Sequence, residues 1–228
     1  MAPFGASRAG LMSVAGDDIP DGNLIRHYPI DDGSGTTIAE VENNENGTFE
    51  GDDDDWESNK GRGDPILFHD GSVRTNIPNL SKLSEYTVAI TIYFDSTPSD
   101  QDSFWGYNEN NRIFAFIDSG NIRFFQEDEN SDNYDVLIDD DNINVNEWNT
   151  FVQRWDGSTM TAEVNADQSG TVSVNSMFDR GSGSAIMDRD SSSGNQATGY
   201  PANFAVYDVD KGDDFAQNYH DSTAGSWN

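Results

Sequence analysis

The chain contains no cysteine and only three lysines, Lys60, Lys82 and Lys211, among its 228 residues. Without cysteine it has no disulfide, no thiolate ligand for a metal and no thiol nucleophile. No apolar run reaches the length of about 18 residues that a membrane-spanning helix needs. The sequence therefore predicts no membrane insertion and gives no indication of a redox compartment.

Basic residues of either kind are scarce, with 12 Lys and Arg against 42 Asp and Glu, for a formal net charge of -30. The acidic residues are dispersed from Asp17 to Asp221. Repulsion at this density of negative charge opposes compact folding in dilute buffer. In about 1 M salt the Debye length falls to about 3 Å, so the salt screens the repulsion. We interpret the composition as an adaptation to saturating salt. It disfavours nucleic acid as a partner, because a polyanion would be repelled.

The apolar residues that remain are periodic, which argues against disorder and for a folded chain. The clearest alternation runs from Thr87 to Phe94, with Val88, Ile90 and Ile92 on one face. Further strands are predicted at 24–28, 65–68, 103–107, 112–117, 121–126, 134–138, 150–155, 159–165 and 203–207. Ser119-Gly120 and Asp156-Gly157 indicate turns between strands. Asn46-Gly47 indicates a further turn, and residues 180–199 are predicted to form a loop.

One short C-terminal helix is predicted over 213–220, where Phe215 and Tyr219 share a face. About ten short strands separated by turn signals are typical of a β-sandwich or barrel. We therefore predict an all-β fold in two parts, an N-terminal arm over residues 1–22 and a sandwich domain over residues 23–228.

The arm is rich in Gly, Ala and Ser and lacks periodicity, yet it carries the apolar residues Phe4, Leu11, Met12 and Val14. Burying them on another subunit would stabilise an assembly, at about 25 cal/mol per Å² before ordering costs. We expect the arm to bind other proteins of an assembly or copies of the chain itself. The alternative is a flexible tail or a cloning remnant.

Several stretches resemble the concanavalin A-like lectin/glucanase superfamily, in its laminin-G-like branch. They are "LIRHYPIDDGSGTTIAEVENNENGTFEG", "YTVAITIYFD", "DSFWGYNENNRIFAFIDSGNIRFF", "NEWNTFVQRWDGSTMTAEVNA" and "NFAVYDVDKGDDFAQNYHD". Together they span roughly residues 23–222 in the order that the family has them. The resemblance implies a jelly roll of two antiparallel sheets, often with a metal at the sandwich edge and a glycan or protein ligand.

The arm "MAPFGASRAGLMSV", the acidic surface and the lack of a signal-peptide core also resemble structural proteins of haloarchaeal tailed viruses. This resemblance implies a virion surface protein, made in the host cytoplasm and extracellular after release. Its roles would be capsid decoration, turret or fibre, with attachment to host-surface glycans. A free haloarchaeal carbohydrate-binding module or adhesin is the alternative, and a glycoside hydrolase is the third hypothesis.

Glycan binding would use aromatic side chains in loops, and "FWGYNENN" offers Trp105 and Tyr107 with Asn108 and Asn110 as hydrogen-bonding neighbours. The competing interpretation is that Trp105 packs inside the sandwich. Trp148 and Trp155 lie on a periodic strand and are predicted to be core residues.

No cofactor is assigned, and calcium is the one candidate. Asp128, Asn130, Asp132 and Asp139 nearly match the spacing of a calcium loop, which needs several converging oxygens. Asn133 stands where that loop has glycine, and Asp139 where it has a bidentate glutamate. The competing interpretation is a hydrated hairpin tip.

Hydrolysis of a glycoside needs two carboxyl groups. The resemblance implies paired acids such as Glu-x-Asp-x-Glu on one strand, and no such pattern occurs. The nearest cluster is Glu127-Asp128-Glu129. The sequence therefore predicts that the chain is not an enzyme.

Overall fold

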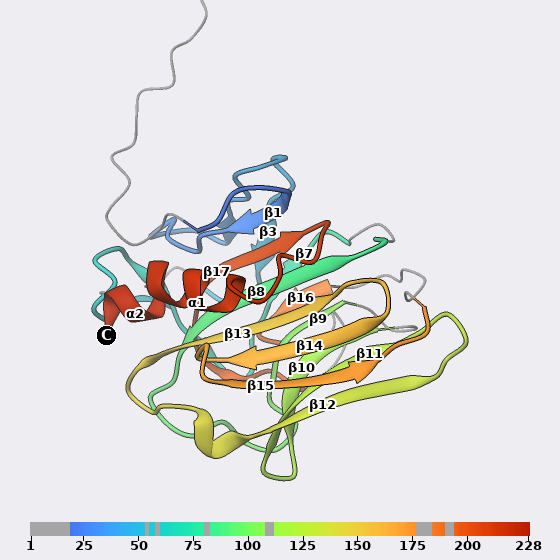
Figure 1. Cartoon of the computed structure of the whole chain (residues 1–228). Coiled ribbons are helices and arrows are strands. Elements are labelled where there is room, and N and C mark those ends of the chain that lie inside the picture. The colour runs from blue at the N-terminus through green and yellow to red at the C-terminus, as the bar shows by residue number, and fades with distance from the viewer. Residues whose placement is uncertain are drawn as a thin grey trace, which may run out of the picture.

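The computed structural model describes residues 19–52, 55–57, 60–79, 83–107, 112–176, 184–189 and 194–228. Two antiparallel sheets pack face to face, and a short helix lies outside them near the C-terminus (Figure 1). The predicted two-sheet jelly-roll sandwich is confirmed.

The first sheet contains seven strands among the described residues, in the order β1-β17-β8-β13-β14-β15, with β6 beside one end of β17. Their bounds are β1 Leu24–Tyr28, β6 His69–Asp70, β8 Tyr86–Tyr93, β13 Trp148–Trp155, β14 Thr159–Val164, β15 Gln168–Ser173 and β17 Thr198–Tyr207. β8 is central, which explains why its apolar alternation is the clearest in the chain.

The second sheet contains eight described strands in the order β12-β11-β10-β9-β16-β7-β3-β2. Their bounds are β2 Thr37–Ile38, β3 Gly47–Phe49, β7 Thr75–Ile77, β9 Ser103–Tyr107, β10 Ile113–Asp118, β11 Asn121–Glu127, β12 Asn133–Asp139 and β16 Ser184–Ile186. A separate ribbon pairs β4 Trp56–Glu57 with β5 Ile66–Leu67.

The predicted turns are confirmed by the backbone. Asp118 pairs with Asn121 across Ser119 and Gly120, whose φ angles are 53° and 81°. Both residues therefore adopt the left-handed conformation that a two-residue hairpin loop requires. In the β13–β14 turn, the Asp156 carboxylate accepts hydrogen bonds from the backbone N–H groups of Ser158 and Thr159.

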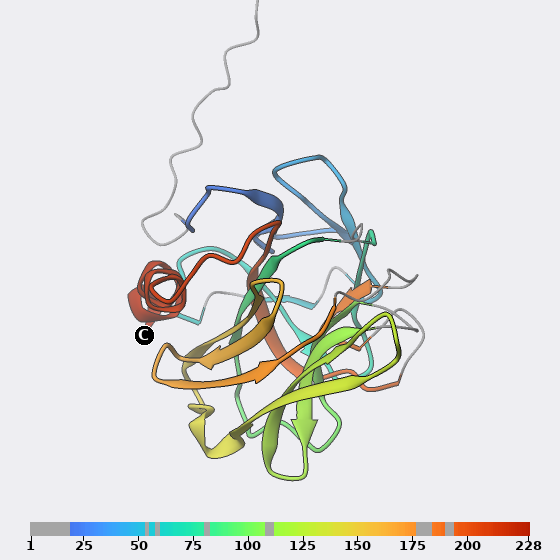
Figure 2. The same cartoon turned by 45° about the vertical axis from the view of Figure 1, so that its right-hand side comes forward.

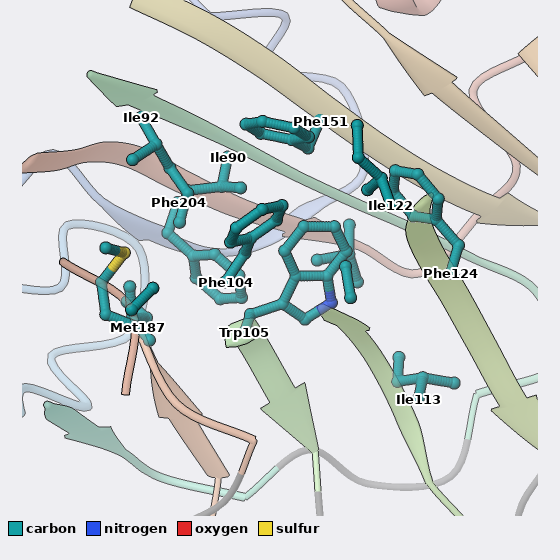
Figure 3. Close-up of a cluster of buried hydrophobic side chains, with 14 of the residues drawn as sticks. Ile90, Ile92, Phe104, Trp105, Ile113, Ile122, Phe124, Phe151, Met187 and Phe204 are labelled. Atoms are coloured by element: carbon teal, nitrogen blue, oxygen red, sulfur yellow. The ribbon is translucent and has the colours of Figure 1, made fainter. Parts of the chain in front are cut away.

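The main core lies between the sheets and is dominated by aromatic and β-branched side chains. Figure 3 shows part of it, with Phe104 and Trp105 from β9 facing Phe151 and Phe204 from the other sheet. The rings of Phe104 and Phe151 lie 4.7 Å apart between centroids. These contacts join the sheets, and large apolar side chains provide most of the favourable burial.

A second cluster covers the outer face of the first sheet. Helix α1 Phe215–Ser222 lies against that face, seen end-on in Figure 2, and α2 Ala224–Trp227 follows it. Phe215 and Tyr219, predicted to share a helix face, are both buried, together with Ala89 and Val152 of the sheet. Ile19, placed by the sequence within the arm, is also buried in this cluster.

Two expectations about loops were wrong. The 180–199 segment contains β16, which is fully buried between β9 and β7, and the first residues of β17. Asn46-Gly47, interpreted as a turn, instead leads directly into β3, which begins at Gly47. Both strands are three residues long, too short for alternation to be recognised.

The arm residues Phe4, Leu11, Met12 and Val14 lie outside the described residues, so their predicted contacts stay predictions. Within the part of the chain that is described, neither α1 nor α2 has the length or apolar character of a membrane-crossing helix.

Candidate functional site

The outer face of the second sheet carries a row of phenylalanines. Ile113, Ala115 and Ile117 of β10 belong to the main core, so the alternate residues Phe114 and Phe116 point away from it. Phe125 of β11 lies directly opposite Phe114, with ring centroids 4.5 Å apart. Phe114 and Phe116 are 5.1 Å apart. The three rings form an apolar cluster separate from the main core.

Three guanidinium groups lie over these rings. The guanidinium carbon of Arg123 is 5.4 Å from the ring centroid of Phe125 and 5.6 Å from that of Phe116. The corresponding distances from Phe114 are 5.8 Å for Arg112 and 5.9 Å for Arg189. Cation–π attraction at these distances is worth about 0.5–1 kcal/mol per pair at exposed sites.

The arginines leave the rings only 4–6% exposed, whereas Leu137, opposite Arg123 on β12, is 58% exposed. We call this surface the outer patch. Its members are Arg112, Phe114, Phe116, Arg123, Phe125, Leu137 and Arg189.

Acidic side chains fix the orientation of two of these arginines. Arg123 donates from Nε and Nη2 to the Asp135 carboxylate, at 2.7 and 2.8 Å, and from Nη1 to Asp118 at 2.9 Å. The hydrogen bonds that Arg123 donates to Asp135 raise the pKa of Arg123 above its already high value. A guanidinium has five N–H groups, and three of those of Arg123 donate to Asp135 and Asp118. On each terminal nitrogen, one further N–H group makes none of these hydrogen bonds. Arg112 is paired with Glu127 at 3.5 Å.

The main chain of Asp188 and Arg189 crosses the outer face beside the phenylalanines. Gly106 of β9 lies opposite Phe114, and a Cβ atom at Gly106 would lie 1.5 Å from the carbonyl oxygen of Arg189. Glycine is therefore required for the close approach. The buried Asp188 carboxylate accepts a hydrogen bond from Arg74 at 3.0 Å, which fixes this segment on the sheet.

The glycan platform predicted at Trp105 and Tyr107 is wrong. Trp105 is completely buried and packs on Phe124, and Tyr107 is 2% exposed beside Phe204. Both side chains belong to the main core between the sheets. Asn108 and Asn110 lie outside the described residues. Trp148 and Trp155 are buried as predicted.

The outer patch was missed by sequence analysis, although a signal was present. "IFAFI" and "NIRFF" are apolar at successive positions, so a strand there must place aromatic side chains on both faces. One of the two faces cannot belong to the core between the sheets.

The four predicted calcium ligands do not converge. Asp128 is buried, and its Oδ1 accepts from the backbone N–H groups of Asn130 at 2.8 Å and Asp132 at 3.1 Å. Its Oδ2 accepts from the Tyr134 hydroxyl. Burial alone would raise the pKa of Asp128, but these hydrogen bonds lower it. Asn130 and Asp132 are exposed, and Asp139 lies at the opposite end of β12.

Asp139 instead lies beside a small cavity at the rim of the sandwich. The carboxylates of Asp139, Asp140 and Asp141 come within 4.8 Å of one another. The adjoining cavity has a volume of about 140 Å³, and almost all of its lining is polar. The lining residues are Asp141, Asn142, Asn144, Val164, Asn165, Asp167 and Gln168. Oxygen-rich surroundings of this kind suit hydrated cations, but adjacent acids are also common on such an acidic surface.

A comparison with protein families matches residues 68–212 to the model described as the concanavalin A-like lectin/glucanases superfamily. That range covers well over half of the 228 residues. The chain belongs to the concanavalin A-like lectin/glucanase superfamily. No curated protein sequence matches this chain significantly.

Solved structures with the same fold include binding domains. Domain 4 of AbnA, a GH43 extracellular arabinanase from Geobacillus stearothermophilus in complex with arabinotriose, superposes with a TM-score of 0.65 at 13% identity. The match covers 87% of this chain and 98% of that domain. The binding domain of Paraclostridial Mosquitocidal Protein 1 superposes with a TM-score of 0.67 at 14% identity. The match covers 88% of this chain and 52% of that one.

The receptor-binding domain of botulinum neurotoxin D gives a TM-score of 0.58 at 15% identity, covering 86% of this chain. Our lectin/glucanase-like chain thus spans about half the length of both toxin structures, 52% in each case. At these identities the likeness shows the fold.

Proposed function

We propose that this chain is a non-enzymatic binding domain that recognises a glycan receptor through the outer patch. The observation that carries the proposal is the combination of phenyl rings, oriented guanidinium groups and an exposed leucine on the outer face of one sheet. The likeness to the receptor-binding domain of botulinum neurotoxin D, to the binding domain of Paraclostridial Mosquitocidal Protein 1 and to the arabinanase domain in complex with arabinotriose supports the same class of function.

The chemistry of the patch suits a sugar. The exposed Leu137 side chain can pack against the C–H groups of a pyranose or furanose ring, while guanidinium N–H groups donate to its hydroxyl oxygens. The phenyl rings beneath Arg112 and Arg123 help to hold these donors against the sheet. Preorganised donors lose less entropy on binding, which favours affinity.

Hydrolysis is disfavoured by how the nearest acids are used. A glycosidase needs two carboxyl groups, one to protonate the leaving oxygen and one to act as base or nucleophile. Asp118 and Asp135 lie at the outer patch, and both accept hydrogen bonds from Arg123. We therefore assign both carboxylates to the orientation of Arg123 and not to the roles of acid and base.

The proposed setting is the virion surface of a halophilic virus, where the domain would decorate the capsid or form part of a turret or fibre. The net charge of -30 supports function in concentrated salt. Residues 1–22 would attach the domain to other virion proteins or to further copies. A free haloarchaeal carbohydrate-binding module or adhesin is the second candidate, favoured by the likeness to the arabinanase domain.

The binding proposal is tested with an array of neutral and acidic oligosaccharides, including arabinotriose, probed in molar KCl. Leu137→Asp and Arg112→Gln should each weaken the strongest interaction at least tenfold. Val41→Asp is the matched control, because Val41 is also an exposed aliphatic residue, at 45%, but follows β2 far from the patch in sequence. Equal binding by wild type and Leu137→Asp would overturn the outer patch as the site.

The setting is tested separately with antibodies raised against the purified domain. Immunogold labelling of virus particles from the producing culture should decorate their surface. Label that is confined to cells or secreted material would favour the adhesin or carbohydrate-binding module.

A further inference from the structure

The outer patch carries negative as well as positive charge. Alternate residues of a strand share a face, so carboxylates lie among its rings and guanidinium groups. They are Asp118 next to Phe116 on β10, Glu127 next to Phe125 on β11, and Asp135 and Asp139 on the two sides of Leu137 on β12. Because these carboxylates accompany the arginines on a chain whose formal net charge is -30, the outer patch is not a basic surface.

Arg123, on the middle strand of these three, already bonds to two of the carboxylates. Its Nε and Nη2 donate to Asp135, and its Nη1 donates to Asp118. The residues directly opposite Arg123 on the neighbouring strands are Phe116 and Leu137, neither of which carries a charge. A carboxylate or sulfate group of a ligand bonded to Arg123 would therefore be the third anion around a single positive charge.

Concentrated salt weakens this repulsion only in part. Arg123, Asp118 and Asp135 are all partly buried, and dissolved ions screen partly buried charges much less than exposed ones. Anions that contact the same guanidinium group also leave little room for a dissolved ion between them. A sugar hydroxyl group adds no charge, and it can accept a hydrogen bond from a guanidinium N–H group that neither carboxylate uses.

The exposed leucine of the outer patch favours the same selection. Leu137 is 58% exposed and lies between Asp135 and Asp139 on its face of β12. An anionic group packed against Leu137 would lose water on that side, which costs free energy, and it would also lie near two carboxylates. The C–H groups of an uncharged sugar ring can bury apolar surface there without that cost.

We propose that Asp118, Asp135 and Asp139 make the outer patch bind uncharged glycans and reject glycans that bear carboxylate or sulfate groups. This inference rests on the glycan-binding function proposed above, and it names the class of ligand. Asp118 and Asp135 are then specificity-determining residues, because they compensate the charge of Arg123 while they orient its N–H groups. The arginines act as hydrogen-bond donors to hydroxyl groups and not as partners for an anion.

The test is an array in molar KCl that carries each neutral oligosaccharide beside its uronate counterpart, such as galactotriose beside trigalacturonate. The two members of a pair differ in whether C6 is a hydroxymethyl or a carboxylate group. The wild-type chain should bind the neutral members at least about tenfold more tightly, because like charges a few ångströms apart repel strongly near a protein surface. Equal or tighter binding of the uronates would overturn the selectivity and leave the glycan function standing. Binding of no member would overturn the glycan function, and the selectivity with it.

Asp118→Asn tests whether a carboxylate sets the selectivity. Asparagine keeps an oxygen that can accept from Nη1 of Arg123 but removes the charge, so the ratio of the uronate to the neutral dissociation constant should fall about threefold or more. Glu147→Gln is the matched control, because it removes the same charge directly before β13 in the first sheet, and there the ratio should not change. An unchanged ratio in Asp118→Asn would contradict the proposal. If this variant fails to fold, the wild-type comparison of paired sugars still decides.

Discussion

Replacing Glu40 with glutamine should destabilise the protein, although it removes one negative charge from a chain that has too many. Glu40 is 3% exposed, and its Oε1 accepts from the backbone N–H groups of His27 at 3.0 Å and Glu42 at 2.9 Å. Its Oε2 accepts from those of Asn43 and Glu45. Burial alone would raise the pKa of Glu40, but these four donors reverse the effect and lower it.

The magnitude follows from which donors lose their acceptor. Glutamine keeps one oxygen but places an amide NH₂ group where Oε2 stood, facing the N–H groups of Asn43 and Glu45. A buried donor left without a partner costs about 1–3 kcal/mol. These two donors are partly buried, so each is expected to cost about 1.5 kcal/mol, in the lower half of that range, and the expected loss is about 3 kcal/mol. For a protein of this size that lowers Tm by roughly 6–12 °C, at about 2–4 °C per kcal/mol.

The assay is thermal unfolding by circular dichroism in molar KCl, with Glu147→Gln as the control. Glu147 is exposed and none of the described contacts involves its carboxylate, so its loss should change the free energy of unfolding by less than about 0.5 kcal/mol. Because the folded-state pKa of Glu40 is lowered, its contribution is present above the unfolded pKa and is lost as pH falls through the folded value. The difference in Tm between wild type and Glu40→Gln should therefore narrow in acid. Equal Tm values for Glu40→Gln and Glu147→Gln near neutral pH would refute the reasoning.

Three further predictions follow from the charge, the outer face and the hairpin tip. Tm should rise from dilute buffer to molar KCl, and a flat or falling Tm would argue against halophilic adaptation. Gly106→Ala should cost more than about 2 kcal/mol by overpacking, whereas Gly194→Ala, with nothing within 4 Å of its new Cβ, should change stability little in the same melting experiment. Asp128→Ala should lower Tm equally with and without calcium, because Asp128 binds backbone N–H groups; a calcium-dependent difference in calorimetry would show a metal site there.

The long elements could be predicted from the sequence because apolar alternation and turn residues are local features. The β10–β11 hairpin follows from alternation on either side of Ser119-Gly120, whose residues suit a tight turn. β15, with the sequence QSGTVS, was missed because it has few apolar residues to alternate. Its position is set by backbone pairing with β14 across a short loop, and a pattern of apolar residues does not reveal such pairing.

The candidate site was harder to predict because it depends on which face of a strand is inside. "FWGY" offered aromatic side chains, but only the strand order shows that β9 lies in the interior of its sheet and that Trp105 completes the core. β10 is apolar on both faces, but the second sheet has only one inner face, so the sequence does not show that Phe114 and Phe116 lie outside the main core. The Phe–Arg contacts then join residues that are distant in sequence, such as Phe114 and Arg189.

The preference for arginine over lysine has a physical basis in how the sheets hold their acids. Several arginines each bind two or three carboxylates: Arg74 binds Glu50 and Asp188, Arg123 binds Asp118 and Asp135, and Arg154 binds Glu163, Asp210 and Asp213. A planar group with five donors can serve several carboxylates at once, whereas an ammonium group is a compact charge with three. A few guanidinium groups can therefore neutralise many of the acids that lie against the sheets. Carboxylates that are not held by an arginine would repel one another, and concentrated salt would screen that repulsion.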